Sequence, residues 1–515
     1  MIPPFHLESH AQNKLAIITC GIILRLSFVN SDPSTTGEWN IVASTGVVGI
    51  HTAILPGSAD DAPLLLFWER FHGLHDPSLY PPNPNTFLPS IGQSELSTQM
   101  TWNPQNPTAS NWVAKHVKFS PFCGGSYLII ILVQSHAMTS NSESIGHAQM
   151  ADGSIFVAGG DGDNVANNYI ADGRKAVRTY SSTTGWVDIG ELTSTRWYPT
   201  ASILPDGRLI IVGGLLESYI PTDPTRNNPS YEIWPADGRG SVPLQVLRPG
   251  YPNNTYSVVM VLPSQRVFIF SAAHSMTMKV GTWEAIINLP DLIHADLYPS
   301  HSFPYLSPSV LLPLREANNF KAEVMICGGT RLDNQASSLG SRIAPDDENA
   351  QWFDENMPGG RVMGDGVLLP DGNVVFVNGA QTGSADGPAG FSKARNPQYA
   401  AHLYSPVSRQ WTLLLPDGRI LTAGSDQQNY DGSAAQPFEY RTEVFSPPYL
   451  FSSSPRPIIS CIPPNIRYND IITISTPSAI TIDLVSAIRQ SLTRRIWIKD
   501  LLSWILLSVI MMVYV

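Results

Sequence analysis

The hydrophobic positions of this chain recur in short apolar runs, each introduced by a polar turn and ended by a pair of small residues. The runs have the length of a strand and are too short for a helix. Asp-Gly turns favour tight hairpins because glycine reaches positive φ without strain. The pattern predicts one repeated β-hairpin, found as MADGSIFVAGG (150–160), LPDGRLIIVGG (204–214), LPSQRVFIFSA (262–272), LPDGNVVFVNG (369–379) and LPDGRILTAGS (415–425).

The period of this repeat indicates the architecture. Gly160 and Gly214 end two successive copies and so mark one period. A strand ending in Gly-Gly at 321–329 and a degenerate first copy at 49–70 bring the number of candidate copies to seven. A strand-rich repeat of about 50 residues with this ending is typical of a kelch-type propeller blade. We therefore predict an all-β protein with a seven-bladed kelch-type β-propeller over 41–440.

The segments that flank the array differ from it. Residues 1–40 form an N-terminal segment with a candidate signal region at 15–29, which Arg25 interrupts. Residues 441–490 alternate short apolar runs with Pro and Ser, which predicts a truncated immunoglobulin-like β-sandwich, a partial early-set domain. Residues 491–515 are an aberrant apolar tail whose last fifteen residues fall short of the roughly 20 that span a bilayer.

Charge and cysteine content exclude some classes of protein. The net charge is −11 and no run of Lys or Arg appears, so we expect no nucleic-acid partner. Four scattered cysteines cannot form a disulfide scaffold, and no CxxC pair indicates zinc. We expect a secreted, extracellular monomer, with a single glycosylation sequon at Asn253; the alternative is a protein anchored to the membrane by its apolar tail.

Several longer motifs together resemble one enzyme family. They are TRWYPTASILPDGRLIIVGG (195–214), GHAQMADGSIFVAGGDG (146–162), which follows Phe-Cys at 122–123, GGRVMGDGVLLPDGNVVFVNGA (359–380) and EVFSPPYLF (443–451). Over residues 37–490 the chain resembles the glyoxal oxidase branch of the galactose oxidase-like copper radical oxidases. The resemblance implies oxidation of small aldehydes such as glyoxal or methylglyoxal to carboxylic acids, with reduction of O2 to H2O2.

The resemblance also implies the site. Oxidation of an aldehyde removes two electrons and a single copper ion accepts one, so these enzymes store the second on a tyrosine joined to a cysteine by a thioether. Tyr198 matches that tyrosine, as catalytic radical and copper ligand, and Cys123 matches its cross-linked partner. We interpret His147, which follows the cysteine motif, as structural.

The chain departs from the family pattern at three places. The segment 124–145 separates Cys123 from Gly146, an anomalous insertion that an unspliced intron would explain. The Tyr-His pair of copper ligands before the last turn is absent, and neither His402 nor Tyr404 replaces it by motif. No histidine follows residue 402, so the C-terminal ligand is absent too. We therefore expect weak copper binding and an inactive chain as written; the alternative is a non-catalytic kelch propeller that binds a protein or glycan partner.

Overall fold

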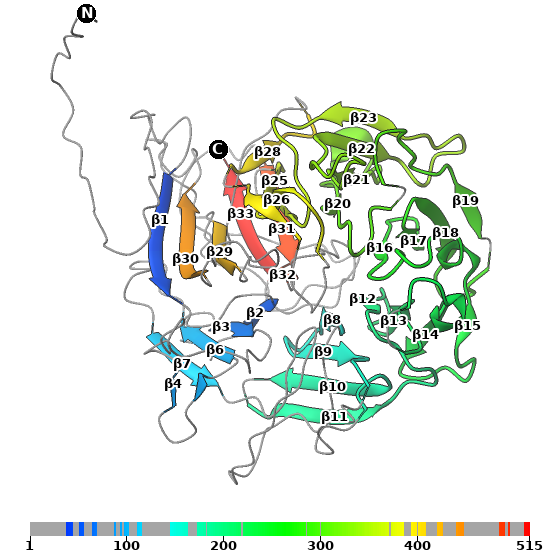
Figure 1. The fold of residues 1–515 in the computed structure, drawn as a ribbon, viewed down its shortest axis with the longest axis horizontal. Helices are drawn as coiled ribbons and strands as arrows, with labels where there is room; N and C mark the ends of the chain where they lie inside the picture. The colour runs from blue at the N-terminus through cyan, green and yellow to red at the C-terminus, as the bar shows by residue number, and fades with distance from the viewer. Residues whose placement is uncertain are drawn as a thin grey trace, which may run out of the picture.

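Antiparallel sheets arranged as a ring make up the structure (Figure 1), which is a computed structural model. It describes residues 145–407 apart from 163–171, 182, 218–219, 285, 299, 370–371, 386–392 and 399, and outside that range the strands β1–β7 and β29–β33. Seven sheets of three or more strands occur among these residues. The predicted all-β fold with a seven-bladed propeller is confirmed.

Each blade takes its strands from one stretch of sequence, except the blade that closes the ring. We number the blades along the chain. In sheet order, blade 1 contains β2 (His51–Leu55), β3 (Leu64–Trp68), β6 (Ser97–Thr101) and β7 (Asn111–Lys115); blade 2 contains β8 (Gly146–Gln149), β9 (Ile155–Ala158), β10 (Ala176–Ser181) and β11 (Gly185–Glu191); and blade 3 contains β12 (Thr200–Ile203), β13 (Leu209–Val212), β14 (Ser230–Trp234) and β15 (Val242–Pro243). Blade 4 contains β16 (Val258–Val261), β17 (Arg266–Ser271), β18 (His274–Lys279) and β19 (Ile287–Leu289), and blade 5 contains β20 (Ser309–Leu311), β21 (Val324–Cys327), β22 (Leu339–Ile343) and β23 (Phe353–Asn356). Blade 6 contains β24 (Asp365–Leu368), β25 (Val374–Val377) and β28 (His402–Tyr404), and blade 7 contains β29 (Ile420–Ser425), β30 (Glu439–Ser446) and β1 (Glu38–Ser44). In Figure 1 the first strands β8, β12, β16 and β20 lie nearest the centre and β11, β15, β19 and β23 lie at the rim.

The two ends of the repeat array meet in blade 7. Strand β1 pairs antiparallel with β30, and Glu38 lies opposite Ser446. This pairing joins the first blade to the last, so the hydrogen bonds of a sheet close the ring. The paired strands extend slightly beyond the predicted limits of 41 and 440.

The inner two strands of the described blades supply most of the core. Strands β9, β12, β13, β16 and β25 are buried along their whole length because both faces pack against neighbouring blades. The turns between these strands follow the prediction. In the turn before β13, the Asp206 carboxylate accepts a hydrogen bond from the Arg208 N–H at 3.0 Å, and Gly207 has φ +84°.

The remaining elements are short. They are the 3₁₀ helices η2 (Pro224–Arg226), η3 (Gln245–Leu247) and η4 (Glu316–Asn318), the hairpins β4 (Phe87–Leu88) with β5 (Gln93–Ser94) and β26 (Ala380–Thr382) with β27 (Arg395–Pro397), and the C-terminal strands β31 (Leu484–Arg489), β32 (Thr493–Arg494) and β33 (Val509–Tyr514).

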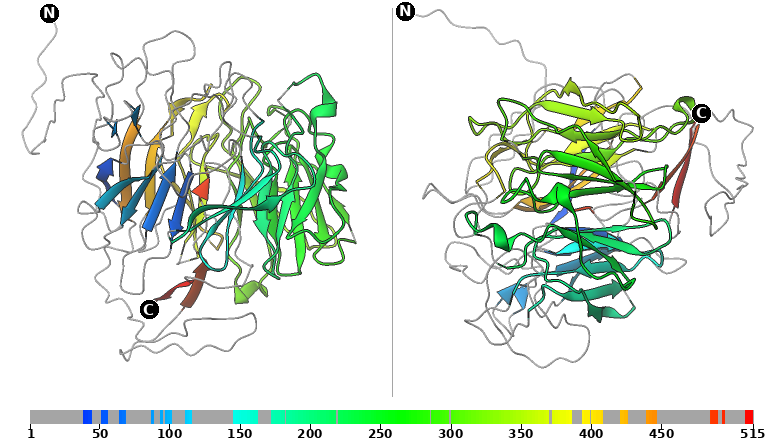
Figure 2. Two further views of the ribbon diagram at one scale, coloured as in Figure 1. Left: turned by 90° about the horizontal axis from the view of Figure 1, so that it is seen from below. Right: turned by 90° about the vertical axis from the view of Figure 1, so that its right-hand side faces the viewer.

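One of the C-terminal strands pairs with the ring. Strand β32 pairs with β2, the first strand of blade 1. Strand β33, from the apolar tail, pairs with β31, and Figure 2 shows this ladder, in red, to one side of the blades. Most of the predicted immunoglobulin-like domain lies outside the described residues, so its extent stays a prediction. No helix within the described part of the chain is long and apolar enough to cross a membrane.

Candidate functional site

The first strand of each blade is preceded by a loop, and the loops of blades 3 to 6 contact one another around Tyr198. The loop before β12 is anchored first by the small residues at the end of β13. A Cβ atom on Gly214 would lie 2.7 Å from the Trp197 carbonyl oxygen, so only glycine allows this approach. Trp197 and Leu215 exchange backbone hydrogen bonds of 2.8 and 2.6 Å beside it.

A buried ion pair provides the second anchor. The Arg196 side chain is fully buried and donates to the Glu232 carboxylate, with Nε 3.0 Å and Nη2 2.9 Å from Oε1. Arg196 Nη1 also donates to the carbonyl oxygens of Gly213 and Ser230. Burial lowers the pKa of Arg196, and the Glu232 charge opposes that shift. Because Glu232, Gly213 and Ser230 accept these hydrogen bonds, most N–H donors of the Arg196 guanidinium have a protein partner.

Glu232 also holds the start of the same loop. Its two carboxylate oxygens accept hydrogen bonds from the backbone N–H groups of Thr193 and Ser194, at 2.6 and 3.1 Å. One carboxylate thus fixes both the loop backbone and the arginine two residues before Tyr198. This network connects the loop that carries Tyr198 to strand β14, which carries Glu232.

Tyr198 itself is buried among aromatic rings. Its side chain is 8% exposed and its backbone is left-handed, with φ +61°. The ring stacks on Phe303, with centroids 4.7 Å apart and an interplanar angle of 29°. Trp197 and Tyr256 contact it edge-on, with centroids at 4.6 and 4.9 Å. These arrangements are among those that aromatic pairs prefer.

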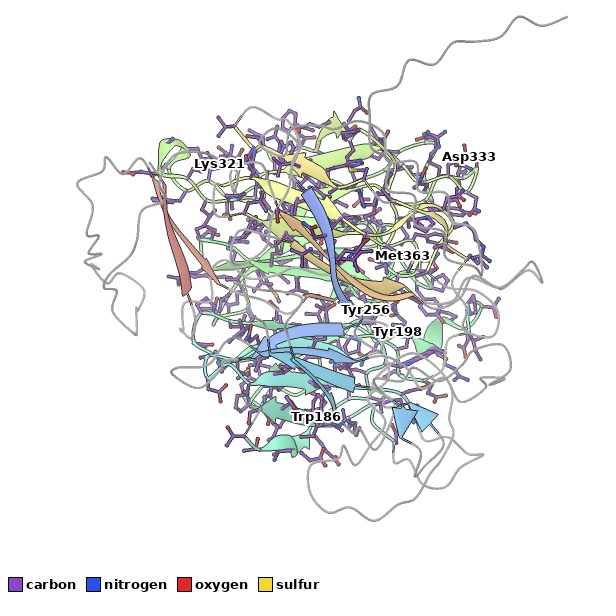
Figure 3. The ribbon with its side chains drawn as sticks, turned by 90° about the vertical axis from the view of Figure 1, so that its left-hand side faces the viewer. Trp186, Tyr198, Tyr256, Lys321, Asp333 and Met363 are labelled. Carbon is purple, nitrogen blue, oxygen red and sulfur yellow. The ribbon has the colours of Figure 1, made fainter. Side chains whose placement is uncertain are left out.

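Two further residues repeat the backbone conformation of Tyr198. Tyr256 has φ +52° and Met363 has φ +58°, and each lies two residues before the first strand of its blade, as Tyr198 does. A left-handed conformation costs a non-glycine residue about 1–2 kcal/mol. Such strain persists where the surroundings determine it, and it is concentrated at functional sites. Figure 3 shows Tyr198 and Tyr256 side by side, with Met363 nearby.

Backbone hydrogen bonds connect these loops from one blade to the next. The Tyr256 N–H donates to the Tyr198 carbonyl at 3.2 Å, and the Phe303 N–H donates to the Thr255 carbonyl at 3.3 Å. The Met363 N–H donates to the Leu306 carbonyl at 2.9 Å. Main-chain hydrogen bonds therefore link blades 3, 4, 5 and 6 around Tyr198, and aromatic contacts also link blades 3, 4 and 5.

Two histidines near this end of the propeller, His301 and His402, are buried, and burial keeps them neutral. Burial lowers the pKa of His301 to about 3, and its Nδ1 lies 2.8 Å from the Ser307 hydroxyl. Burial and the Arg361 charge lower the pKa of His402 to about 4. His147 lies half-buried on β8. Its predicted structural role stays a prediction, as do the roles of Tyr198 and Cys123.

Copper(II) favours a tetragonal set of nitrogen and oxygen donors. Tyr198 belongs to a hydrophobic cluster with Tyr256 and Leu306, and the described part of the chain holds no group of three or more His, Cys, Asp or Glu side chains that could bind a metal ion. Cys123 and the segment before the last hairpin lie outside the described residues, so the predicted cross-link stays a prediction.

Sequence reasoning missed most of the side chains around Tyr198. Tyr256 and Met363 could have been found by aligning the positions just before each first strand, since NTYSVVMV and RVMGDGVL then match RWYPTASI. Glu232 and Phe303 gave no such signal. One lies in a third strand and the other in a loop, where no repeat fixes the residue type.

The comparison with known proteins identifies the family. Residues 132–449, more than half of the chain, match the family described as glyoxal oxidase N-terminus. The chain belongs to the glyoxal oxidase family. Tyr198 lies within the matched residues and Cys123 lies before them.

Two curated relatives of this glyoxal oxidase family member are named aldehyde oxidases. The chain is 32% identical over 383 residues to aldehyde oxidase GLOX of Vitis pseudoreticulata, with 66% of this chain and 68% of the relative covered. It is 29% identical over 331 residues to aldehyde oxidase GLOX1 of Arabidopsis thaliana, with 56% of this chain covered, and it spans about half the length of that relative, 51%. The family resemblance inferred from the motifs is confirmed, and the relatives are oxidoreductases.

A solved structure supports the fold. A fungal alcohol oxidase of the AA5 family, in complex with copper, superposes with a TM-score of 0.59 at 16% identity, covering 90% of this chain and 88% of that one. At this identity the likeness concerns the architecture. It agrees with the ring of blades seen here.

Proposed function

We propose that this protein oxidises small aldehydes of the glyoxal and methylglyoxal type to carboxylic acids, with O2 as the electron acceptor. The hydrated aldehyde loses two electrons and two protons, and O2 takes them up as H2O2, so one acid and one peroxide form per turnover. Support comes from the family match and from relatives that are named aldehyde oxidases.

The observation that carries the proposal is the environment of Tyr198. A tyrosine that serves as an oxidisable group needs a fixed ring in a site with little water, because solvent would quench a radical. Tyr198 has such a site: it is 8% exposed, stacked on Phe303 and held by the Arg196–Glu232 ion pair. We propose Tyr198 as the redox residue, with Cys123 as its thioether partner and copper as the cofactor that the family implies.

The donor set limits this activity in the chain as its sequence stands. Tyr198 is the one motif-matched copper ligand in the sequence, and the described residues hold no group of three or more His, Cys, Asp or Glu side chains that could bind a metal ion. We therefore propose that this chain holds copper weakly and turns over far more slowly than a complete family member. A transcript without codons 124–145 that also supplied a Tyr-His pair and a C-terminal histidine would encode the complete enzyme.

Copper content and peroxide release test both parts of the proposal. The full chain, purified with excess copper and desalted, should retain well under one copper per molecule, and peroxide formed with methylglyoxal should be slow and abolished in Tyr198→Phe. Tyr198→Phe is the matched control because it removes only the hydroxyl. Peroxide formation that Tyr198→Phe leaves unchanged would exclude Tyr198, and stoichiometric copper with rapid turnover would show that ligands exist elsewhere in the chain.

We also propose that the protein is secreted. The candidate signal region and the sequon at Asn253 support an extracellular protein. Recovery of the protein from the culture medium of an expressing cell, with an N-terminus beyond residue 29, would support it. Retention of the whole chain inside the cell would contradict it.

A further inference from the structure

Met363 occupies the place in blade 6 that Tyr198 occupies in blade 3. Both residues have left-handed φ, at +58° and +61°, and both lie two residues before the first strand of their blade. A fully buried arginine lies two positions earlier in each case, Arg196 before Tyr198 and Arg361 before Met363. The Arg361 guanidinium donates to the carbonyl oxygens of Asn378 and Ala400, so a buried arginine anchors this loop too.

Met363 also contacts the surroundings of Tyr198. Its side chain packs against the buried cluster that contains Tyr198 and Tyr256. Its N–H donates to the carbonyl of Leu306, three residues after Phe303, the ring that stacks on Tyr198. A change in the Met363 side chain would therefore disturb both the cluster and the loop that carries the stacking ring.

Exposure separates Met363 from most other methionines of the described residues. Five of them are at most 4% exposed and lie in the cores of blades: Met260, Met276, Met278, Met325 and Met357. Met363 is half-buried, as is Met150 in the turn after β8 of blade 2. Met150 packs against a different cluster, which does not include Tyr198.

We propose that Met363 is a peroxide-sensitive residue of this protein, and that its oxidation loosens the aromatic packing around Tyr198. The sulfur donates an electron pair to one oxygen of H2O2, the O–O bond breaks, and the other oxygen leaves as water after taking a proton. The thioether is oxidised to the sulfoxide and the peroxide is reduced. The sulfoxide is polar, and a polar group is unfavourable in an apolar cluster.

The peroxide has two chemical sources. It forms at this end of the propeller if the proposed aldehyde oxidation takes place, and in that case Met363 acts as a product-driven brake. It also reaches the residue from solvent. The first source rests on the proposed function and the second does not, so the experiments below treat them separately.

Added peroxide tests the site itself. The folded full-length chain is treated with graded H2O2, and the added oxygen on each methionine-containing peptide is followed by mass spectrometry. Met363 should be oxidised about tenfold faster or more than each of the five buried methionines, because access to the sulfur controls the reaction. Oxidation of Met363 at the rate of the buried methionines would overturn the proposal.

A pair of variants tests the consequence. Met363→Leu conserves volume and removes the sulfur, and Met150→Leu is the matched control because Met150 is also half-buried. Peroxide should reduce the near-ultraviolet circular dichroism of the aromatic cluster in the wild type and in Met150→Leu, and should leave Met363→Leu unchanged. An equal loss in Met363→Leu would show that sulfoxide formation there does not affect Tyr198.

Aldehyde without added peroxide distinguishes the sources. Methylglyoxal and O2, with catalase present to remove peroxide from solvent, should produce sulfoxide at Met363 if peroxide forms beside it. Absence of sulfoxide under these conditions, together with selective oxidation by added H2O2, would contradict the brake and retain the solvent-driven site.

Discussion

Replacing Glu232 with alanine should release the loop that carries Tyr198. The variant leaves the Arg196 guanidinium buried without its counter-ion and removes the acceptor for the N–H groups of Thr193 and Ser194. Removing one partner of a buried ion pair costs about 3–5 kcal/mol, mainly because the other charge stays desolvated. Two stranded backbone donors act in the same direction, at about 1–3 kcal/mol each before the loop relaxes. We therefore expect a loss of at least about 3 kcal/mol in the free energy of unfolding.

Guanidinium titration followed by tryptophan fluorescence measures this loss, with Lys321→Ala as the control. Lys321 makes a 2.7 Å ion pair with Asp347, and the two side chains are 44% and 47% exposed. Exposed pairs contribute about 0–1 kcal/mol. The two variants therefore contrast a buried and an exposed ion pair in the same protein. If Glu232→Ala cost no more than Lys321→Ala, the ion pair would not anchor the loop and the account of how Tyr198 is positioned would be wrong.

Three other measurements test separate parts of the structure. Gly214→Ala should destabilise the protein by at least about 1 kcal/mol more than Gly238→Ala. Both glycines have positive φ, but only at Gly214 would a Cβ atom lie 2.7 Å from the carbonyl oxygen of a neighbouring loop. Equal losses in the free energy of unfolding would show that this close contact does not matter. The pKa of His301 falls from 6.5 to about 3 on folding, so between these pH values the unfolded chain binds one more proton than the folded chain. The free energy of unfolding should therefore fall as the pH decreases from 6.5 to about 3, and it should fall less steeply in His301→Asn. A free energy of unfolding that does not change with pH, or an equal slope in His301→Asn, would contradict this. Peptide mapping after exposure to copper and O2 should find Cys123 and Tyr198 in one cross-linked species that has lost two hydrogens, whereas recovery of both peptides unmodified would exclude the thioether.

The repeat made the fold predictable because a propeller places the same local structure in every blade. The turn, the apolar strand and the small pair recur in sequence, so the number of blades followed from counting them. Closure of the ring was harder to foresee. Strand β1 precedes the first copy and pairs with β30, which follows the last copy, and no local pattern reports a contact between the two ends of the array.

The candidate site was predictable only where a motif carried it. Tyr198 belongs to TRWYP, a motif with a recognisable meaning, whereas Phe303 lies in a loop of no fixed pattern and reaches Tyr198 only because blades 3 and 5 curve around the same centre. Glu232 could not be predicted either. A glutamate in an apolar strand looks like a surface residue, and its burial makes sense only once Arg196 is found facing it.

The strained residues show what the backbone at this end of the propeller accomplishes. Tyr198, Tyr256 and Met363 each carry a large side chain on a left-handed backbone, at about 1–2 kcal/mol apiece, in a position where glycine would avoid the cost. Stability alone would favour glycine there. The cost is tolerated because buried arginines and blade-to-blade hydrogen bonds determine the conformation, and the left-handed turn directs each side chain toward its neighbours. The fold therefore keeps the surroundings of Tyr198 at the expense of stability, and this placement argues that the side chains around Tyr198 have a function beyond packing.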